Sequence, residues 1–325
     1  MKGAPVRPAH ARVTAATADG RMGEGLRGPA PGLIAVIFDF SRGKQALLTV
    51  AQPALGVVLA LGGLPPWRVV AVGLPAACAA SFSLYALNDL LDRKVDEASL
   101  AAGKTAVPEH DIDTAFVRHP LARGLLSLRM SVVWVAGLAA LGALGIAILS
   151  PLALAFFAAA GLTQVAYCAL RAVTPWKTVL SGVMVGCGGL AGWAAVAPLR
   201  VSALGLFAVL ALWEIGGRNI VNDLSDVGSD ASVGIRTVAT VHGAAAAART
   251  AAAVSAACLA ATVLLPMPAF SVALALALGC WALGVPAVRL VRRPTPAQAA
   301  SFFNHGSLYP DLLLAALLVG LAVTA

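Results

Sequence analysis

The amino-acid sequence predicts an all-α membrane protein, with about nine transmembrane helices in one bundle around a central cavity and with cytoplasmic cap loops. Of its 325 residues, 59% are hydrophobic and 12% are charged, and the mean hydropathy is +0.86. Soluble domains average about 45–50% apolar and about 25% charged residues, so this composition excludes an ordinary soluble enzyme. The apolar stretches are near twenty residues long, which indicates helices rather than the roughly ten-residue strands of a membrane barrel.

The first part of the chain differs from the rest in composition. Residues 1–31 are rich in Ala, Gly, Pro and Arg and contain no apolar run. We interpret residues 1–40 as a disordered basic tail and residues 41–325 as one helical domain. The tail lacks the apolar region of a signal peptide. An organelle transit peptide stays open as an alternative, although Asp19 and Glu24 count against it.

Nine apolar stretches follow the tail, each near the length of about 20 residues that spans a hydrocarbon core. They cover residues 46–63, 67–87, 131–150, 151–171, 178–199, 201–217, 244–264, 268–291 and 306–325. Pro151 and Pro268 begin two of these stretches and suit the first turn of a helix, where a missing N–H is harmless. Their many Gly and Ala residues predict close packing between helices in lipid.

The positive charges predict the orientation of the chain. With nine spans and a cytoplasmic N-terminus, 21 of the 23 Lys and Arg residues fall on the cytoplasmic side, and Arg68 and Arg200 fall outside. Lys and Arg concentrate in the cytoplasmic loops of membrane proteins. We therefore expect the N-terminus and the functional loops in the cytoplasm. Arg outnumbers Lys 18 to 5 and Ala is abundant, which indicates a GC-rich bacterial genome and hence the bacterial inner membrane. We expect membrane lipid as a partner but no nucleic acid, because no basic patch is interleaved with exposed aromatics.

Two acidic clusters, at residues 88–96 and 222–230, share the pattern N-D-L-x-D-x-x-x-D. On a helix, the three aspartates of such a cluster lie within about 60° of one another and therefore share a face. Four membrane crossings separate the two clusters, so both are expected on the cytoplasmic side, converging across the mouth of one cavity. Their members are Asn88, Asp89, Asp92, Asp96, Asn222, Asp223, Asp226 and Asp230.

Six carboxylates at one mouth require a cation, because they repel one another and are costly near lipid. Carboxylate and amide oxygens suit Mg²⁺, which bridges to substrate phosphates. The sequence has no His–Cys set for zinc, since its five cysteines lie in apolar stretches without a CxxC pair. We therefore predict Mg²⁺ and a phosphorylated or diphosphorylated ligand. Asn88 and the six aspartates are the predicted metal ligands, and the predicted catalytic set is Asp89, Asp92, Asp226 and Asp230.

Basic residues near the clusters are candidates for binding diphosphate oxygens, where arginine forms two parallel hydrogen bonds. They are Arg93, Arg118, Arg123, Arg171, Lys177 and Arg236. For any one of them the alternative is a topology signal. Tyr167 lies four residues before Arg171 on the same helix face, so it either lines the cavity mouth or is an interfacial aromatic. Asn219 and Asn222 are also assigned to the substrate cavity, and Glu214, inside a predicted span, is expected at the cavity floor.

At these residues the chain resembles the UbiA superfamily of intramembrane prenyltransferases. The similar segments are 88–96 and 226–230 for the family's two aspartate motifs, 167–171 for Y-x-x-x-[KR], 234–237 for G-x-[KR]-T and 307–309 for a signature opening the last helix. The resemblance covers roughly residues 40–325. It implies nine helices around a cavity, and aspartates that bind Mg²⁺ and the diphosphate of an isoprenoid donor.

The resemblance also implies a reaction. Ionisation of a polyprenyl diphosphate gives an allylic carbocation, which an acceptor traps. An aromatic or quinone-like acceptor is favoured, with a lipid acceptor close behind. A membrane terpene cyclase of the same superfamily is the main alternative. A cation transporter is less favoured, because transporters place acidic residues in mid-span and the clusters here lie at helix ends.

The stretch after the first cluster departs from the family pattern. A longer segment, 97–117, replaces the family's N-K-P-x-R-P-I-x-S-G stretch, and His119-Pro120 stands where the family has Arg-Pro. Arg123 stands where the family has Ser before Gly. We therefore expect an altered cap loop with an unusual acceptor or a different lid. His119 itself is expected to be exposed to solvent rather than to act as a base.

Overall fold

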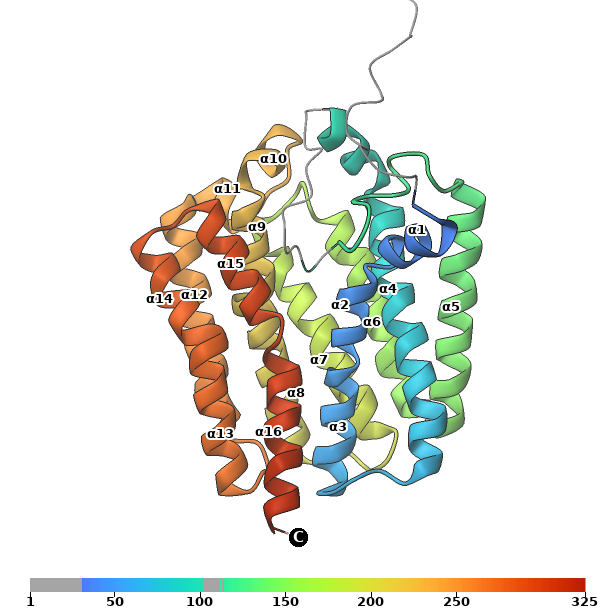
Figure 1. The fold of residues 1–325 in the computed structure, drawn as a ribbon, viewed down its shortest axis with the longest axis vertical. Coiled ribbons are helices and arrows are strands. Elements are labelled where there is room, and N and C mark those ends of the chain that lie inside the picture. The colour runs from blue at the N-terminus through green and yellow to red at the C-terminus, as the bar shows by residue number, and fades with distance from the viewer. Residues whose placement is uncertain (1–30, 102–111, 113, 325) are drawn as a thin grey trace, which may run out of the picture. The chain divides into compact units, whose positions relative to one another are not determined.

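The structure is a computed structural model that describes residues 31–101, 112 and 114–324. The predicted basic tail therefore lies outside the described residues up to residue 30, as does most of the predicted cap segment 97–117. The described residues form helices and connecting turns without a strand, as the sequence predicts. Figure 1 shows the long helices running side by side, with α1 and α10 at the end opposite to the C-terminus.

The first half of the bundle contains the first acidic cluster. Its helices are α1 (Leu33–Phe40), α2 (Gly43–Thr49), α3 (Ala51–Leu61), α4 (Trp67–Ala101), α5 (Leu128–Leu149) and α6 (Pro151–Ala169). Helix α4 packs along α5, and Ser150 caps α6 by accepting a hydrogen bond from the N–H of Ala153. Pro151 occupies the first turn of α6, as predicted. Helix α1 lies inside the range that we interpreted as a tail, and its Asp39 and Phe40 are buried.

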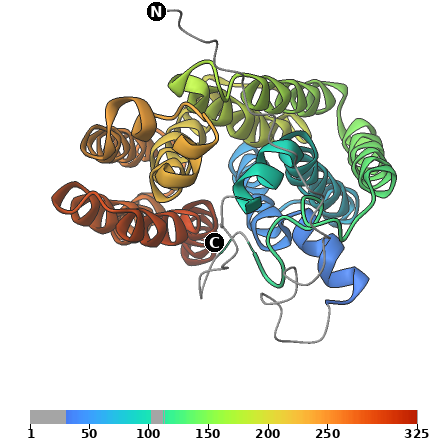
Figure 2. The ribbon, with the colours of Figure 1, turned by 90° about the horizontal axis from the view of Figure 1, so that it is seen from above.

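The second half contains the second cluster. Its helices are η1 (Pro175–Lys177), α7 (Thr178–Ala194), α8 (Val201–Leu212), the π-helix η2 (Trp213–Asn219), α9 (Ile220–Ser225), α10 (Val227–Ser232), α11 (Val238–His242), α12 (Ala244–Thr262), α13 (Ala269–Gly279), the π-helix η3 (Cys280–Gly284), α14 (Val285–Arg292), α15 (Pro296–Gly306) and α16 (Tyr309–Thr324). Seen from above, α12–α16 lie on one side of the described bundle and α4–α6 on the other (Figure 2).

Eight helical segments of the described chain are long and apolar enough to cross a membrane. The predicted fifth stretch forms α7, whose 17 residues make it slightly shorter than these eight segments. The chain is therefore an integral membrane protein. Its helices pack closely where a glycine of one helix faces the backbone of another, since a Cβ atom on Gly192 would lie 1.9 Å from the carbonyl oxygen of Pro53.

Candidate functional site

One cavity of about 450 Å³ receives residues of both acidic clusters. At its mouth lie Asn88, Asp92 and Asp96 from α4, Asn222 and Asp223 from α9, Asp226 from the turn that follows, and Asp230 from α10. Deeper walls are apolar and come mainly from α3 to α7. They include Val57, Val69, Leu74, Ile146, Leu149, Phe157 and Met184. The structure thus brings the two clusters together at the polar end of a largely apolar cavity.

The first cluster lies on one continuous helix, and each of its aspartates faces a basic residue of another segment. Asp89 is buried and accepts from Arg42, with a distance of 3.0 Å between Nη2 and Oδ1. Asp92 forms an ion pair with Arg171 at the end of α6. Asn88 donates to Asp92 at 3.2 Å, which orients that carboxylate beside the cavity.

The second cluster is broken into short helices. The turn at Asp226 separates α9 from α10, and the side chain of Asp226 lies 3.6 Å from Arg118 of the cap loop. Lys177 is buried and lies 3.5 Å from Oδ1 of Asp223. Burial opposes the charge of Lys177, but the neighbouring Asp223 and Tyr167 outweigh it and raise the pKa of the ammonium group. Lys177 therefore stays protonated at neutral pH.

Tyr167 lines the cavity, which is one of the two positions that the sequence left open for it. Its hydroxyl accepts from Nζ of Lys177 at 2.8 Å and from Nδ2 of Asn219 at 3.0 Å. The ammonium of Lys177 also lies 4.3 Å from the centre of the Tyr167 ring, within cation–π range. These contacts connect α6, η1 and η2 through polar groups next to Asp223.

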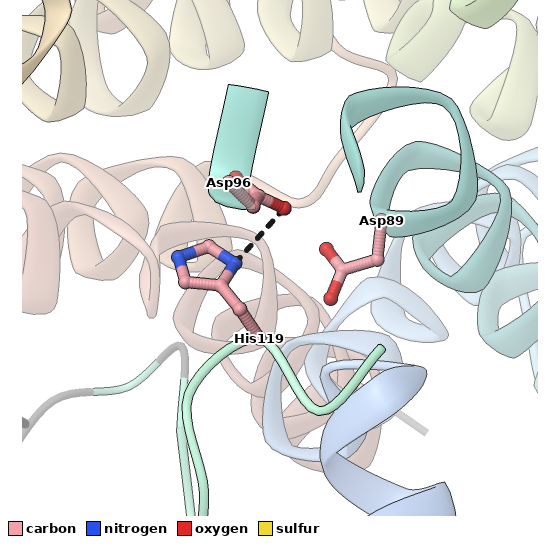
Figure 3. A group of neighbouring side chains, drawn as sticks. All are labelled: Asp89, Asp96 and His119. Atoms are coloured by element: carbon pink, nitrogen blue, oxygen red, sulfur yellow. Dashed lines mark ion pairs between the residues drawn. The ribbon is translucent and has the colours of Figure 1, made fainter. Parts of the chain in front are cut away.

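His119 is not exposed to solvent, so that expectation was wrong. Its side chain is 13% exposed, and its Nδ1 lies 3.1 Å from Oδ2 of Asp96. Figure 3 shows the imidazole facing the carboxylates of Asp89 and Asp96, and one ligand atom of each of the three residues lies within 4.8 Å of the others. The backbone of His119 is left-handed, with φ of 52°, which is uncommon for a residue other than glycine. The cap loop therefore adds a nitrogen donor to the first cluster.

The cap loop is held by a residue that the sequence did not single out. The carboxylate of Asp39, on α1, accepts hydrogen bonds from the backbone N–H groups of Ala115, Phe116 and Val117. Asp39 is 3% exposed. The ammonium of Lys44 donates to the carbonyl oxygen of Thr114 at 2.7 Å. These contacts fix the segment that leads directly into Arg118 and His119.

Three predicted phosphate-binding residues lie elsewhere. Arg93 forms an ion pair at 2.7 Å with Glu97 on the exposed side of α4. Arg236 is exposed, and its backbone N–H donates to the carbonyl of Arg171. Arg123 donates from Nε to the carbonyl oxygen of Arg118 at 2.8 Å. None of the three is among the described residues that line the cavity.

Arg42 and Gln164 contact the first cluster, and the sequence did not identify either residue. Gln164 donates to Oδ1 of Asn88 at 2.7 Å and lines the cavity. Arg42 adopts a left-handed backbone, with φ of 44°, as the chain turns from α1 into α2. Neither residue belongs to a repeated or charged pattern. A polar residue inside an apolar stretch was the one available signal for Gln164.

The donor atoms at the cavity mouth fit a hard divalent cation. They are mostly carboxylate and amide oxygens, which Mg²⁺ prefers. One observation supports a ligand there directly: Oδ2 of Asp223 is buried and accepts no hydrogen bond from any residue that the structure describes. Because a buried carboxylate oxygen without a partner is costly, this atom is suited to a bound cation.

A model of the UbiA prenyltransferase family matches residues 49–309 of the chain. Among curated proteins, the chain is 29% identical over 191 residues to protoheme IX farnesyltransferase of Polaromonas naphthalenivorans, which covers 57% of this chain and 58% of that protein. It is 29% identical over 212 residues to protoheme IX farnesyltransferase of Salinispora tropica, covering 65% and 62%. The chain thus spans about three fifths of the length of these relatives.

Solved structures share the fold. A UbiA homologue from Archaeoglobus fulgidus, bound to DMAPP and Mg²⁺, aligns with a TM-score of 0.63 at 15% identity over 86% of this chain and 98% of that one. An apo UbiA homologue from Aeropyrum pernix aligns with a TM-score of 0.60 at 18% identity over 89% and 99%. The chain therefore has the helical fold of these UbiA homologues.

Proposed function

Because the chain belongs to the UbiA prenyltransferase family, we propose that it transfers a prenyl group from a polyprenyl diphosphate to an acceptor in a Mg²⁺-dependent reaction. The observation that carries this proposal is one cavity that has residues of both aspartate clusters at its mouth and apolar side chains deeper inside. A diphosphate ester with a hydrocarbon tail fits such a cavity, because its diphosphate can bind through a metal ion at the acidic mouth and its tail can lie along the apolar walls.

Mg²⁺ and the donor class are also supported by the related structures. The Archaeoglobus fulgidus homologue was solved with DMAPP and with GPP, in each case with Mg²⁺. In this chain, Asn88 and the six cluster aspartates would hold the ion. When bound, the ion would neutralise the charge that develops on the departing diphosphate. Asp223 would contribute its buried Oδ2, which accepts no hydrogen bond from the described part of the chain.

The basic residues at the mouth would bind the diphosphate oxygens. Arg118 and Arg171 lie against Asp226 and Asp92 and both line the cavity, so their guanidinium groups stand next to the carboxylates that would hold Mg²⁺. They would bind the diphosphate oxygens there, where arginine forms two parallel hydrogen bonds. Lys177 would attract the diphosphate as a fixed positive charge in the cavity wall, because its contacts with Tyr167 and Asp223 hold it in place.

The apolar walls would hold the isoprenoid tail and exclude water from the allylic carbocation. The allylic carbocation must react with the acceptor before it reacts with water. The cap loop with Arg118 and His119 would therefore cover the cytoplasmic side of the cavity. We favour an aromatic or quinone-like acceptor, with a lipid acceptor second. The names of the relatives add protoheme to the acceptors to be tested. We place the protein in a bacterial inner membrane with this mouth in the cytoplasm.

The test uses the purified full chain in lipid nanodiscs. Geranyl, farnesyl and geranylgeranyl diphosphates would each be supplied with Mg²⁺ and a panel of hydroquinone, phenol, glycerolipid and haem acceptors. Prenylated acceptor, abolished by EDTA and restored by Mg²⁺, is the expected result. Cyclised hydrocarbon formed without any acceptor would replace the transferase assignment with the terpene cyclase. Lack of any metal-dependent consumption of all three donors would contradict both.

A further inference from the structure

A second polar group lies deeper in the same cavity, away from the aspartate clusters. Glu214 and Arg218 lie four residues apart on η2, with Oε2 of Glu214 3.1 Å from Nη1 of Arg218. Their side chains are 7% and 9% exposed, and both line the cavity. They sit inside the apolar segment Val201–Ser225, which is long enough to cross a membrane. The sequence-based expectation that Glu214 lies at the cavity is therefore confirmed.

A buried ion pair of this kind contributes little to the free energy of folding. Removing two charges from water costs more than their attraction returns in many proteins, and well-packed apolar residues of similar volume serve folding equally well or better. Ionisable residues within membrane spans therefore mark functional sites by default. The pair also occupies a π-helix, a local widening that occurs frequently at functional sites.

Neighbouring helices hold the pair in a fixed position. The hydroxyl of Ser181, on α7, donates to Oε1 of Glu214 at 2.5 Å. The guanidinium of Arg218 donates to Gln45 of α2 and, at 3.3 Å, to the hydroxyl of Tyr85 on α4. Four elements thus converge on one preorganised polar group in a wall that is otherwise largely apolar.

The outer face of η2 is closed by packing, which leaves the polar face for the cavity. A Cβ atom on Gly216 would lie 2.8 Å from the backbone nitrogen of Ser255 on α12, and one on Gly217 would lie 2.8 Å from Leu283. The guanidinium of Arg218 lies 5.6 Å from the ring centre of Phe303, which also lines the cavity. A ligand therefore reaches the pair from the cavity side.

The pair is close to the position where the donor would ionise. Arg218 precedes Asn222 by one helical turn, about 6 Å along the axis. Asn219, the next residue, donates to Tyr167, which binds Lys177 beside Asp223. A molecule that contacts Glu214 and Arg218 would therefore present its reactive part to the allylic end of the donor.

We propose that the Glu214–Arg218 pair is the acceptor-recognition site and that it selects a neutral hydroxyl group, phenolic or alcoholic. This inference rests on the proposed prenyl transfer. The two charges cancel, so the pair offers no net attraction to a carboxylate, and Glu214 repels one. A hydroxyl, in contrast, donates to Glu214 while its oxygen accepts from Arg218 or Tyr85. The acceptor's hydroxyl is thereby bound and oriented about one helical turn from the second cluster.

The test measures binding of three matched probes to the full chain in nanodiscs, loaded with Mg²⁺ and farnesyl thiolodiphosphate, a donor analogue that resists ionisation. The probes are 1-naphthol, 1-methoxynaphthalene and 1-naphthoate. The wild-type chain should bind 1-naphthol at least about tenfold more tightly than the ether or the carboxylate, as one hydrogen bond to a charged group predicts. Equal binding of the phenol and its ether, tighter binding of the carboxylate, or no binding of the phenol would overturn the proposal.

Glu214→Gln should reduce the preference for 1-naphthol over its ether to less than about threefold, because the amide keeps the volume and loses the charge. Ser181→Ala keeps the charge and should give an intermediate preference, so the test survives if the first variant fails to fold. Thr262→Val is the matched control. It removes a buried hydroxyl that contacts Tyr309 at 2.6 Å outside the cavity lining, and it should keep the wild-type preference.

Retention of the full preference in Glu214→Gln would also overturn the proposal. The outcome remains separable from that of the prenyl-transfer proposal. Mg²⁺-dependent binding of the thiolodiphosphate by the wild-type chain is recorded in the same experiment. Its loss would count against prenyl transfer itself, whereas normal analogue binding without hydroxyl preference would count against the acceptor site alone.

Discussion

The two acidic clusters have the same residue pattern but differ in backbone and in surroundings. Residues 88–96 lie within the uninterrupted helix α4, of 35 residues. Residues 222–230 are divided between α9 and α10, with the break at Asp226, whose φ of −100° and ψ of 9° are not helical. The first cluster therefore presents one straight acidic face, whereas the second bends toward it over the mouth of the cavity.

The clusters also differ in the nitrogen-bearing side chains that face them. Arg42, Arg171 and His119 come to the first cluster from three segments, and the side chain of Arg42 is 23% exposed. The second cluster receives Lys177, at 3% exposure, and Arg118 of the cap loop. We infer that the shared aspartate pattern would supply the oxygen ligands for the metal in both clusters. The neighbouring segments give each cluster its own electrostatic environment.

The largest effect is expected from removing one carboxylate of either cluster. Asp92→Asn and Asp226→Asn should each lower the rate of prenyl transfer by about 100- to 1,000-fold, because each loses an oxygen that stabilises charge during ionisation. Steady-state rates with excess donor and Mg²⁺ measure this. Glu97→Gln, on the exposed side of α4, is the matched acidic control and should retain the wild-type rate. A much smaller loss in one cluster than in the other would show that the halves contribute unequally.

The next effect concerns the buried cation of the second cluster. Lys177→Met should lower the free energy of unfolding by about 3 kcal/mol, because Asp223 is left buried with an uncompensated charge. Arg42→Met should cost less, since the guanidinium of Arg42 is partly in contact with solvent. Thermal unfolding in detergent reports both values.

The double variant Lys177→Met with Asp223→Asn serves as the control for this prediction. It should recover part of the lost stability, because the stranded charge is removed together with its partner. Equal losses in the single and double variants would mean that Lys177 contributes through packing of its alkyl chain rather than through its charge.

A smaller effect is expected at the cap loop, which contacts both clusters through Arg118 and His119. Asp39→Asn replaces the carboxylate that accepts from three backbone N–H groups by a neutral amide with one accepting oxygen. We expect kcat/KM for the donor to fall by about tenfold while the bundle stays folded. Asp39→Glu should recover some of this loss. Limited proteolysis should cut the variant faster near residues 114–117, and unchanged cleavage would contradict the assignment.

The smallest effect is expected at Arg93, the basic residue of the first cluster that faces away from the cavity. Arg93→Gln should change the donor KM by less than about twofold, since exposed ion pairs contribute little. A tenfold rise in the donor KM would mean that Arg93 turns into the site when the donor binds. Arg93 would then join Arg171 as a cavity residue beside the first cluster.

The sequence by itself determined the class of fold and the acidic half of the site. Each membrane span is visible as a run of about twenty apolar residues. Such a run is recognised without knowing which distant segments it contacts. The repeated aspartate spacing is also local, so residue order alone identifies both clusters, whereas it left two positions open for Tyr167. The structure places them at one cavity, apart from Asp89, which is held beside it by Arg42.

The counter-charges were decided by tertiary structure. Arg93 is adjacent in sequence to Asp92, yet it faces Glu97, while Asp92 meets Arg171, 79 residues away. His119 approaches Asp96 because Asp39 holds the cap loop from another helix. Such contacts depend on which segments the packing brings together, and residue spacing carries no information about that. The sequence thus specified which groups need compensation in a membrane and offered six basic candidates, and only the fold decided that Arg118, Arg171 and Lys177 are the ones that meet the aspartates.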